Sequence, residues 1–557
     1  MSRVDYIKET ISTIPFIKKI YKCEEENSII YGKVQVALED LDIPLDFTFQ
    51  INPQYPLKHH ESESISFYNK DLIELNHVME SGSICIHTSH HTNLKQKILI
   101  DFDSLKQWIK KYYINKDNDL KYEHIVVEEY LLNDSYYSYI FTDVDYTFTK
   151  GEFGEVEISP LLDTTYKNKH MQNHIITGFR NSYKSIINCM WSQDYQNSDK
   201  AYLGLFYFMK EAPVKHNRFI LKDWNDFSKL LSIDFLNYLH NYEKRNIAKY
   251  KNTVIPIFIG YKTIDIEVHW QVALIEIGSF PIEGVAEKVL GIKTGKWNTH
   301  LIKSDIKWAL TRNSSYKYFF GRGSLNKDIT DKKILIIGLG AIGSMLAKTL
   351  TNTGCKYIDI ADYDIKEPEN VCRSEYQFQF GLGDKVMEMK RILTAISPFI
   401  EIEIFKNEYF ESMIKTFHKD KEIKKIFTSS LNQYDIIFDC TTDNDLMYIL
   451  DNLKLNCTVI NISMTNHAQA LVCAFYPNIY HFVSAQFQDV LENDLVNLYE
   501  PTGCWSPTFK ASYNDINLLV QLAIKHINNL FRYGNQKNNF IIQDNVEKSL
   551  GLKVIEY

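Results

Sequence analysis

The sequence predicts an α/β multidomain protein whose C-terminal part is a doubly wound, Rossmann-like parallel sheet. Its 557 residues allow roughly three or four domains of about 100–200 residues each. After residue 311, short apolar strands alternate with helical segments, a pattern that builds parallel sheets. Near the N-terminus, apolar and polar residues tend to alternate in two stretches, which is typical of half-buried strands.

We expect three domains, at residues 1–155, 156–310 and 311–557. The first should be an α+β domain. It opens with a helix-like segment, Val4–Ile20, followed by the strand-like stretches Ile29–Leu38 and Leu45–Ile51. Asn52–Pro56 then breaks the chain as a turn. Asp103–Ile114 has the pattern of an amphipathic helix, with Asp103 as its N-cap.

The middle region, 156–310, mixes apolar strands such as Val254–Gly260 and Val268–Gly278 with polar, helix-like pieces. It contains no motif that carries chemistry. We therefore interpret it as an α/β scaffold or linker domain, since most ordered sequence is structural.

The third region opens with a β-branched strand, Lys333–Ile337, that ends at Gly338. The helix Ala341–Thr353 follows and is ended by Gly354, a usual C-terminal cap residue. Later elements complete the alternation of strands and helices. They are the strands Tyr357–Ala361, Asp435–Asp439 and Thr458–Ser463, and the helix Asn514–Phe531.

Composition narrows the class of partner and compartment. The net charge is −8 and no basic face is evident, so nucleic acid is not the expected ligand. No run of about 18 apolar residues predicts a membrane span, and the N-terminus lacks a signal-peptide core. The nine cysteines include no C-x-x-C pair, which argues against a disulfide framework and a zinc-thiolate site. We expect free thiols in a reducing cytoplasm.

A glycine-rich loop, Gly338-x-Gly340-x-x-Gly343, directly follows a strand and opens a helix. In that context the glycines let the backbone approach a phosphate, and the helix N-terminus supplies free N–H groups. An acidic residue about 20 positions further on usually binds ribose hydroxyls, and Asp362 fits that role. The loop alone does not distinguish a dinucleotide from ATP.

The residues after Asp362 favour ATP. Asn370, Arg373 and Lys385 place two cations just past the ribose-binding acid. Hydride transfer needs no such cations, whereas displacing pyrophosphate requires that triphosphate charge be neutralised. Asp443, after another strand, could hold Mg²⁺ beside the phosphates. An oxidoreductase is therefore the weaker interpretation.

This constellation resembles the ThiF/MoeB and ubiquitin-activating superfamily, whose members carry a glycine loop, D-x-D, N-x-x-R, a lysine and C-T-D-N. Here the last motif reads C-T-T-D-N, one threonine longer. The resemblance implies ATP-dependent adenylation of a carboxylate. It assigns ribose to Asp362, phosphates to Asn370, Arg373 and Lys385, and Mg²⁺ to Asp443. Family members usually form homodimers in which an N-terminal arginine reaches a nucleotide; Arg312 and Arg322 are the candidates.

Two cysteines of the third region could receive an acyl group from the adenylate. Cys440 ends a strand, where a small apolar role is expected. Cys504 lies in a Gly/Pro-bounded loop, Pro501–Phe509, just before a predicted helix, where a thiol can be exposed and have a lowered pKa. The loop resembles the catalytic loop of bacterial ubiquitin-activating-like enzymes, so we predict the first thioester at Cys504.

The first region resembles a ubiquitin-conjugating enzyme. A helix and strands precede Tyr55-Pro56, His77 and Cys85, in the order of that family. The resemblance makes Cys85 the conjugating thiol and His77 a catalytic residue. The family's H-P-N motif is altered, because Val78 and Met79 follow His77, so the residue that replaces the oxyanion-stabilising asparagine is open.

Three histidines crowd Cys85: His87, His90 and His91. One of them could deprotonate an incoming amine or assist the thiol. They could equally belong to a solvated polar loop. A zinc site is the weakest interpretation because paired thiolates are absent.

Together the two resemblances imply a fused activating–conjugating enzyme of the kind found in bacterial antiphage (CBASS) systems. Its expected substrate is the C-terminus of a cGAS/DncV-like nucleotidyltransferase, carried on Cys504 and then Cys85 to a lysine of an acceptor protein. Two alternatives stay open. One is a sulphur-carrier adenylyltransferase, which has no use for the Cys85 domain. The other is a non-catalytic adaptor gated by nucleotide.

Overall fold

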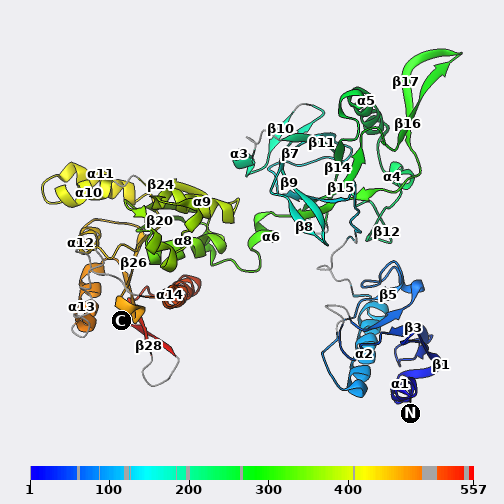
Figure 1. Cartoon of the computed structure of the whole chain (residues 1–557), viewed down its shortest axis with the longest axis horizontal. Helices are drawn as coiled ribbons and strands as arrows, with labels where there is room; N and C mark the ends of the chain where they lie inside the picture. The colour runs from blue at the N-terminus through cyan, green and yellow to red at the C-terminus, as the bar shows by residue number, and fades with distance from the viewer. Residues whose placement is uncertain are drawn as a thin grey trace. The chain divides into compact units, whose positions relative to one another are not determined.

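The computed structural model divides into two compact units, residues 1–313 and 314–557 (Figure 1). It describes residues 2–58, 63–86, 88–117, 125, 127–183, 185–195, 201–263, 267–405, 408–491, 511–544 and 551–557. In those ranges no helix is long and apolar enough to span a bilayer. The unit boundary falls next to the expected start of the third region at residue 311. The further division at residue 155 stays a prediction.

The first unit begins with a helix and an antiparallel sheet of five strands in sequence order. Ser2 caps the first helix by accepting a hydrogen bond from Asp5 N–H. The sheet packs on a later helix through aromatic contacts such as Phe67–Phe102, whose ring centroids lie 5.0 Å apart. The elements are α1 (Arg3–Ser12), β1 (Ile17–Glu26), β2 (Ile29–Val36), β3 (Leu45–Ile51), β4 (Ile65–Tyr68), η1 (Lys70–Leu72), β5 (Ser83–Ile84), α2 (Leu94–Trp108) and η2 (Ile109–Ile114).

Two predicted helices of this region have wrong limits. The helix expected over Val4–Ile20 ends at Ser12, and β1 begins at Ile17. Pro15 explains the difference, because proline disfavours helical backbone in the residue before it. The helix expected from Asp103 begins at Leu94 instead, capped by the side chain of Asn93.

A second sheet of the first unit closes into a ring. Its strands run in the order β18-β15-β14-β11-β7-β9-β6-β19. β18 pairs with β15 and β19 with β6, and these end strands are consecutive pieces of one segment, so the sheet has no free edge there. The strands are β6 (Ser135–Phe141), β7 (Phe153–Pro160), β9 (Lys169–Asn181), β11 (Tyr202–Phe208), β14 (Val254–Lys262), β15 (Val268–Glu276), β18 (Lys307–Trp308) and β19 (Leu310–Asn313).

Smaller elements decorate this ring, which we call the barrel. β6 lies upstream of the predicted limit at residue 155, so the barrel draws strands from both sides of it. One face of its strands packs under α4 and α5 through Trp224, Phe235 and Leu239. The additional elements are β8 (Thr164–Tyr166), β10 (Ile186–Asn188), α3 (Ser192–Tyr195), β12 (Val214–Lys215), β13 (Phe219–Ile220), α4 (Trp224–Ser228), α5 (Ile233–Tyr250), β16 (Ile282–Val289) and β17 (Ile292–Leu301).

The second unit is the predicted doubly wound sheet, with strand order β24-β21-β20-β25-β26-β27-β28-β29. The five strands from β24 to β26 are parallel, and each later pair is antiparallel. The strands are β24 (Glu401–Ile404), β21 (Tyr357–Ala361), β20 (Lys333–Ile337), β25 (Ile436–Asp439), β26 (Thr458–Met464), β27 (Ala470–Phe475), β28 (Phe540–Asp544) and β29 (Leu552–Glu556).

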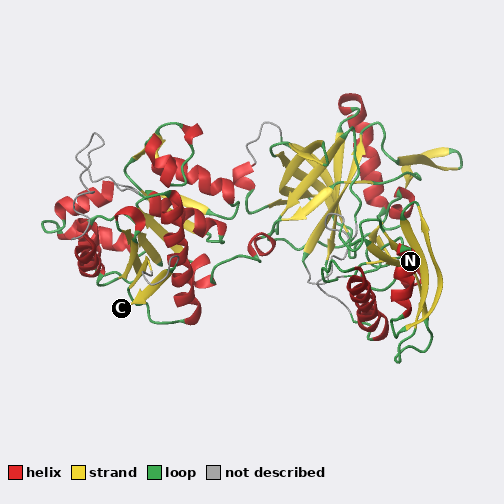
Figure 2. Cartoon of the chain, turned by 60° about the horizontal axis from the view of Figure 1, so that its bottom comes forward, coloured by secondary structure: helices red, strands yellow, loops and turns green. Residues whose placement is uncertain are grey.

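Helices cover both faces of this sheet (Figure 2). On one face α8 (Ala341–Asn352), α9 (Lys385–Ile396) and α14 (Tyr513–Tyr533) share a core with Ile334 and Ile336. On the other face Leu335 and Ile337 pack with four more helices. These are α10 (Glu408–Thr416), α11 (Lys421–Leu431), α12 (Asn444–Asp451) and α13 (Ile479–Leu491).

Short elements complete the second unit, and the predicted strands and helices of this region are confirmed as elements. The short ones are α6 (Tyr316–Phe320), α7 (Lys327–Thr330), β22 (Ile365–Lys366), η3 (Pro368–Arg373), η4 (Phe378–Phe380), β23 (Gly383–Asp384) and η5 (Asn466–Ala468).

The barrel offers a direct test of its aromatic packing at Gly260. A Cβ atom there would lie 2.5 Å from Trp270 Cζ3 and 2.6 Å from Phe208 Cδ2, and both rings are buried. Gly260→Ala should therefore lower the free energy of unfolding by about 1–3 kcal/mol, measured by urea titration of tryptophan fluorescence. In the control Gly323→Ala, the new methyl has no neighbour within 4 Å. A loss at Gly260 no larger than at Gly323 would contradict this packing.

Candidate functional sites

The glycine loop lies at the point where strand order reverses. β20 pairs with β21 on one side and β25 on the other, so the loops after these strands diverge at one edge of the sheet. Ligands of doubly wound sheets bind in that crevice. A cavity of about 380 Å³ opens here. Gly338, Gly340, Asp362, Lys385 and Asp443, all predicted site residues, line it.

Backbone geometry explains two of the glycines. Gly338 has φ +84°, in the left-handed region, and a Cβ there would lie 3.0 Å from the Cys440 carbonyl carbon. At Gly343 a Cβ would lie 1.8 Å from the Gly338 carbonyl oxygen, so the loop closes against the helix without any side chain between them. Gly340 faces open space and leaves the α8 N-terminus free for an anion.

Asp362 braces the same loop from the end of β21. Its Oδ2 accepts a hydrogen bond from Leu339 N–H at 2.6 Å, and its Oδ1 accepts one from Asp364 N–H at 2.8 Å. The carboxylate is thus fixed in direction beside the glycine loop while still lining the cavity. Its orientation is compatible with the predicted hydrogen bond to ribose.

Lys385 begins α9 and is only 7% exposed. Its Nζ lies 2.5 Å from Asp364 Oδ2, and both side chains line the cavity. The pair holds a cation at the mouth of the glycine loop, where phosphate charge is expected. An incoming phosphate could compete with Asp364 for this ammonium group.

Asn370 and Arg373 lie elsewhere. Both belong to the short helix η3 and are not among the residues that line the cavity. Asn370 Oδ1 accepts a hydrogen bond from Glu367 N–H at 2.9 Å, which caps η3. Their predicted contacts with phosphate therefore stay predictions.

The threonine-lengthened motif forms a tight turn at the end of β25. Thr442 has φ +58°, an uncommon conformation for a β-branched residue. Asp443 caps α12, with its Oδ1 accepting hydrogen bonds from Asp445 and Leu446 N–H groups at 2.8 and 3.1 Å. These two hydrogen bonds use only one of the two carboxylate oxygens. The extra threonine thus leaves Asp443 at the cavity wall.

Asp443 fits Mg²⁺ only in company with phosphate oxygens. Among the residues that the structure describes, no group of three or more His, Cys, Asp or Glu side chains could hold a metal. Mg²⁺ commonly takes one or two carboxylates, with waters and substrate phosphates as the remaining ligands. A single cavity carboxylate is consistent with that mode.

Sequence reasoning missed the apolar wall of the cavity. Phe410 and Ile414 from α10 line it, together with Leu446 and Met464. The spacing of Phe410 and Ile414 on one helical face was a possible signal, but nothing in the sequence places α10 over the glycine loop. The wall makes one side of the cavity suitable for an apolar ring face.

Sequence reasoning also gave no role to the carboxylate of Asp439. It is fully buried and accepts hydrogen bonds from Thr441 N–H, Thr441 Oγ1 and Asn461 Nδ2 at 3.1, 2.7 and 2.9 Å. Burial raises its pKa although these bonds oppose the shift. Asp439 fixes the turn that leads to Asp443. The adjacent Cys440 is buried, which raises the pKa of its thiol, so an apolar role is consistent with its setting.

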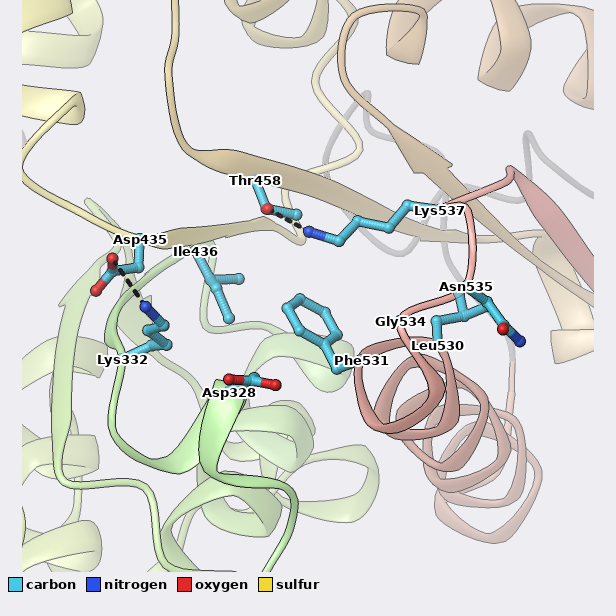
Figure 3. Close-up of a pocket in the computed structure, with 10 residues that line it drawn as sticks. All are labelled: Asp328, Lys332, Asp435, Ile436, Thr458, Leu530, Phe531, Gly534, Asn535 and Lys537. Atoms are coloured by element: carbon cyan, nitrogen blue, oxygen red, sulfur yellow. Dashed lines mark hydrogen bonds and ion pairs between the residues drawn. The ribbon is translucent and has the colours of Figure 1, made fainter.

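A second cavity, of about 390 Å³, opens at the opposite edge of the sheet, where β25 and β26 begin (Figure 3). Lys537 Nζ donates to Thr458 Oγ1 at 2.8 Å, and Lys332 Nζ lies 3.6 Å from Asp435 Oδ1. None of the predicted site residues lines this cavity.

Cys85 directly follows β5 in the first unit and is exposed. Its N–H donates to the His77 carbonyl at 2.7 Å, and Val78 pairs with Ile84, so a small hairpin carries the thiol. Partial desolvation by the surrounding chain raises the pKa of the Cys85 thiol. Cys504 and His87 lie outside the described residues.

The histidines predicted near Cys85 lie in different environments. His77 has φ +64° and is 7% exposed, and its ring centroid lies 4.9 Å from that of Tyr112. Its backbone carbonyl accepts the hydrogen bond from the Cys85 N–H. His91 Nδ1 accepts a hydrogen bond from Asn93 N–H at 3.0 Å, and His90 is exposed. Of the histidines near Cys85 that the structure describes, His77 is buried, His91 is half-buried and His90 is exposed.

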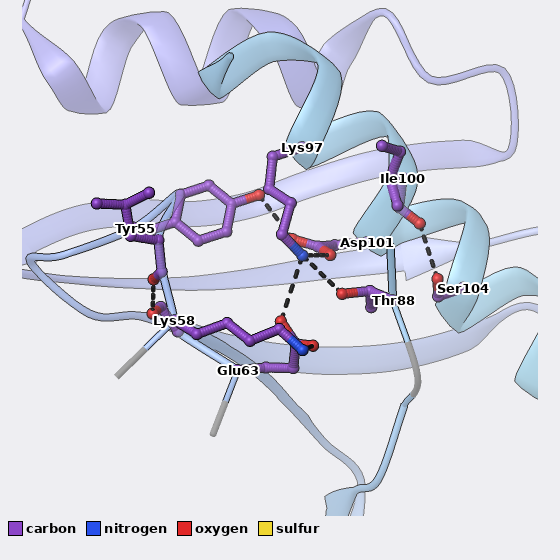
Figure 4. A network of polar contacts seen from close by, with 10 residues as sticks. Tyr55, Lys58, Glu63, Thr88, Lys97, Ile100, Asp101 and Ser104 are labelled. Carbon is purple, nitrogen blue, oxygen red and sulfur yellow. Dashed lines mark hydrogen bonds and ion pairs between the residues drawn. The ribbon is translucent and has the colours of Figure 1, made fainter. Parts of the chain in front are cut away.

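A buried network anchors the chain downstream of Cys85 (Figure 4). Lys97, only 1% exposed, donates to Thr88 Oγ1 at 2.6 Å, pairs with Asp101, and lies 3.3 Å from Glu63 Oε2. Tyr55 O–H donates to the other Asp101 oxygen at 2.8 Å. Burial raises the pKa of Asp101. The network ties the segment after the thiol to α2 and to the Tyr55 turn.

Comparisons with known proteins find similarity in the segment that carries the glycine-loop cavity. Residues 312–492 match the ThiF family. The chain is 29% identical over 237 residues to the ATP-dependent ubiquitin transferase-like protein Cap2 of Enterobacter hormaechei subsp. hoffmannii, covering 41% of this chain and 37% of Cap2. It is 23% identical to the molybdopterin-synthase adenylyltransferase of Escherichia coli, covering 25% of this chain and 50% of that protein.

In both alignments the chain spans half or less of the relative's length. Among solved structures, E. coli MccB with succinimide shares 17% identity over 41% of this chain and 64% of that chain, with a TM-score of 0.28. The glycine loop, the switch point of the sheet and the family match all concern the same segment. The C-terminal part of this chain therefore carries a ThiF domain with a Rossmann-like adenylation fold.

Proposed function

We propose that this chain is an ATP-dependent protein-conjugating enzyme. One observation carries the proposal: the glycine loop, Asp362, Lys385 and Asp443 surround a single cavity. In the proposed arrangement ATP is the substrate, with its ribose at Asp362 and its phosphates at the α8 N-terminus and Lys385. Mg²⁺ at Asp443 would offset phosphate charge.

The first step is the activation of a carboxylate. A carboxylate oxygen of a partner protein's C-terminus attacks the α-phosphorus of ATP, the new P–O bond forms, and the bond to pyrophosphate breaks. Lys385 and the α8 N–H groups stabilise negative charge as pyrophosphate leaves. Similarity to Cap2 and to adenylyltransferases supports this reaction class.

The next steps move the acyl group between thiols. The Cys504 thiolate attacks the acyl carbon and expels AMP. The Cys85 thiolate then displaces Cys504, and a lysine amine of an acceptor protein displaces Cys85, forming an amide and losing a proton. A ubiquitin-conjugating-like domain around Cys85 is supported by the order of α1, the five-stranded sheet, Cys85 and α2.

The partner belongs to the same proposal. We place a cGAS/DncV-like nucleotidyltransferase as the protein whose C-terminus is activated, in a bacterial antiphage (CBASS) system in the cytoplasm. The ThiF domains would pair as a homodimer, with Arg312 or Arg322 reaching a nucleotide. Arg312 lies in β19, where its Nη1 donates to the Thr311 carbonyl at 2.8 Å.

A sulphur-carrier adenylyltransferase is the second candidate, favoured by similarity to the molybdopterin-synthase enzyme. It would share the adenylation step and make no use of Cys85. The two candidates therefore differ in what happens after the acyl-adenylate forms.

Replacing each thiol separately should split the reaction. Cys85→Ala should allow a partner–enzyme thioester at Cys504 and stop amide products, because only the second transfer is lost. Cys504→Ala should abolish the thioester while ATP–pyrophosphate exchange continues. Non-reducing gels and mass spectrometry with the candidate nucleotidyltransferase measure the thioester and the amide products, and labelled pyrophosphate measures the exchange. Cys457→Ala, at the opposite edge of the ThiF sheet before β26, serves as the control. Intact conjugation in Cys504→Ala would refute the relay.

Removing the cavity cation should slow adenylation itself. Lys385→Ala should reduce the rate of ATP–pyrophosphate exchange by roughly a hundredfold to a thousandfold, as expected when one stabilising donor is lost. Lys421→Ala is the matched control, since Lys421 also begins a helix, α11, but is exposed and does not line the cavity. Equal exchange rates in the two variants would remove Lys385 from the site.

The pH dependence of alkylation should report the environment of Cys85. Burial raises its pKa, and only the thiolate reacts, so iodoacetamide labelling should reach half its maximum rate above about pH 8.5, the value for a free thiol. Mass spectrometry of the Cys85 peptide measures the rate, with the urea-unfolded chain as reference. A midpoint at or below that of the unfolded chain contradicts the desolvated setting.

A further inference from the structure

Side chains in and after the hairpin β12–β13, which decorates the barrel, contact the segment just upstream of Cys85. Three basic side chains around the short strands β12 and β13 reach the segment Ile73–Glu80. The Arg218 guanidinium donates to the Ile73 carbonyl. His216 Nδ1 lies 2.5 Å from Glu74 Oε1, and Lys222 Nζ lies 2.8 Å from Glu80 Oε2. We call these three contacts the clasp.

The grasped segment leads directly into the Cys85 hairpin. Within it the Met79 N–H donates to the Ser83 carbonyl at 2.7 Å, and the Cys85 N–H donates to the His77 carbonyl at 2.7 Å. Trp108 Nε1 of α2 donates to the Asn76 carbonyl at 3.2 Å. A shift of Ile73–Glu80 must therefore move the backbone on which the thiol sits.

Arg218 is the strongest part of the clasp. It is 4% exposed, its guanidinium carbon lies 5.1 Å from the centroid of the Phe219 ring, and it bonds to a backbone carbonyl rather than a mobile side chain. The other two contacts join exposed side chains and are screened by water and salt. A buried charge-assisted hydrogen bond has greater directional strength.

We propose that the barrel sets the position of Cys85 through this clasp, with Arg218 as the positioning residue. The inference rests on the proposed role of Cys85 as the conjugating thiol. It gives the barrel a part in the transfer step: the hairpin β12–β13 that decorates it holds the segment before Cys85, and the Lys97 network holds the segment after it. The thiol is thus held from both directions along the chain.

Positioning matters because thioester transfer depends on the approach angle of two reacting groups. A displacement of about 1 Å at such a site can cost about a hundredfold in rate. Loss of Arg218 should accordingly slow transfer from Cys504 to Cys85 and leave adenylation and the Cys504 thioester unchanged. Ground-state reactivity of Cys85 should change with it, because the local desolvation of the thiol changes.

The test uses the full chain with Arg218→Gln, Arg218→Lys and the control Lys215→Gln. Lys215 lies in the same hairpin but pairs with Asp226, at 2.7 Å. Arg218→Gln should shift the pH profile of Cys85 alkylation and slow the appearance of the Cys85 thioester roughly tenfold or more. Arg218→Lys should restore most of the rate, because it keeps a cationic donor, and Lys215→Gln should match the unaltered chain.

Unchanged alkylation and transfer in Arg218→Gln would overturn the inference. If that variant does not fold, the exposed pair of substitutions His216→Gln and Lys222→Gln decides instead: a smaller shift in the same direction supports the clasp, and no shift overturns it. Failure of the proposed function has a separate signature, because Cys85→Ala would then still form amide products.

Discussion

The central strand β20 must be buried on both faces, and this constraint organises the candidate nucleotide site. Ile334, Leu335 and Ile336 have no exposed surface, and they face two different cores. A strand with both faces covered pairs on both edges, here with β21 and β25. All three strands are parallel, so their carboxyl ends lie at the same edge of the sheet. Gly338, Asp362 and Asp443, which follow these ends, therefore line one cavity although they are far apart in the sequence.

The second constraint is that buried charged groups need partners, and near both candidate sites those partners lie close by. Lys366, 1% exposed, pairs with Glu388 at 2.7 Å, and Asp439 accepts hydrogen bonds from three donors. In the first unit Lys97 faces Asp101 and Glu63. An unpaired charge in such positions would be strongly unfavourable, so these side chains have little freedom. Rigid surroundings are what a site needs when it must hold reacting groups at fixed angles.

The sequence predicts best where one segment carries its own signal. Lys333–Ile337 and the glycine loop are local, and both were predicted. The start of α2 was missed because Lys97 and Asp101 look like solvent-facing residues, yet they are buried against each other. The barrel was beyond prediction, since its closure depends on pairing 310–313 with 138–141. The places of Asn370 and Arg373 depend on the fold of η3, which no spacing rule fixes.

The thiols show how tertiary structure selects among chemically identical groups. Cys355, Cys440 and Cys473 are buried, and burial raises the pKa of each thiol, which keeps them protonated and unreactive. Cys85 and Cys372 are the exposed cysteines of the described chain. Cys372 belongs to the short helix η3 and donates to the Glu369 carbonyl at 3.2 Å, whereas Cys85 ends a hairpin anchored through its own backbone. Exposure makes a thiol accessible, and a fixed backbone gives it a defined position.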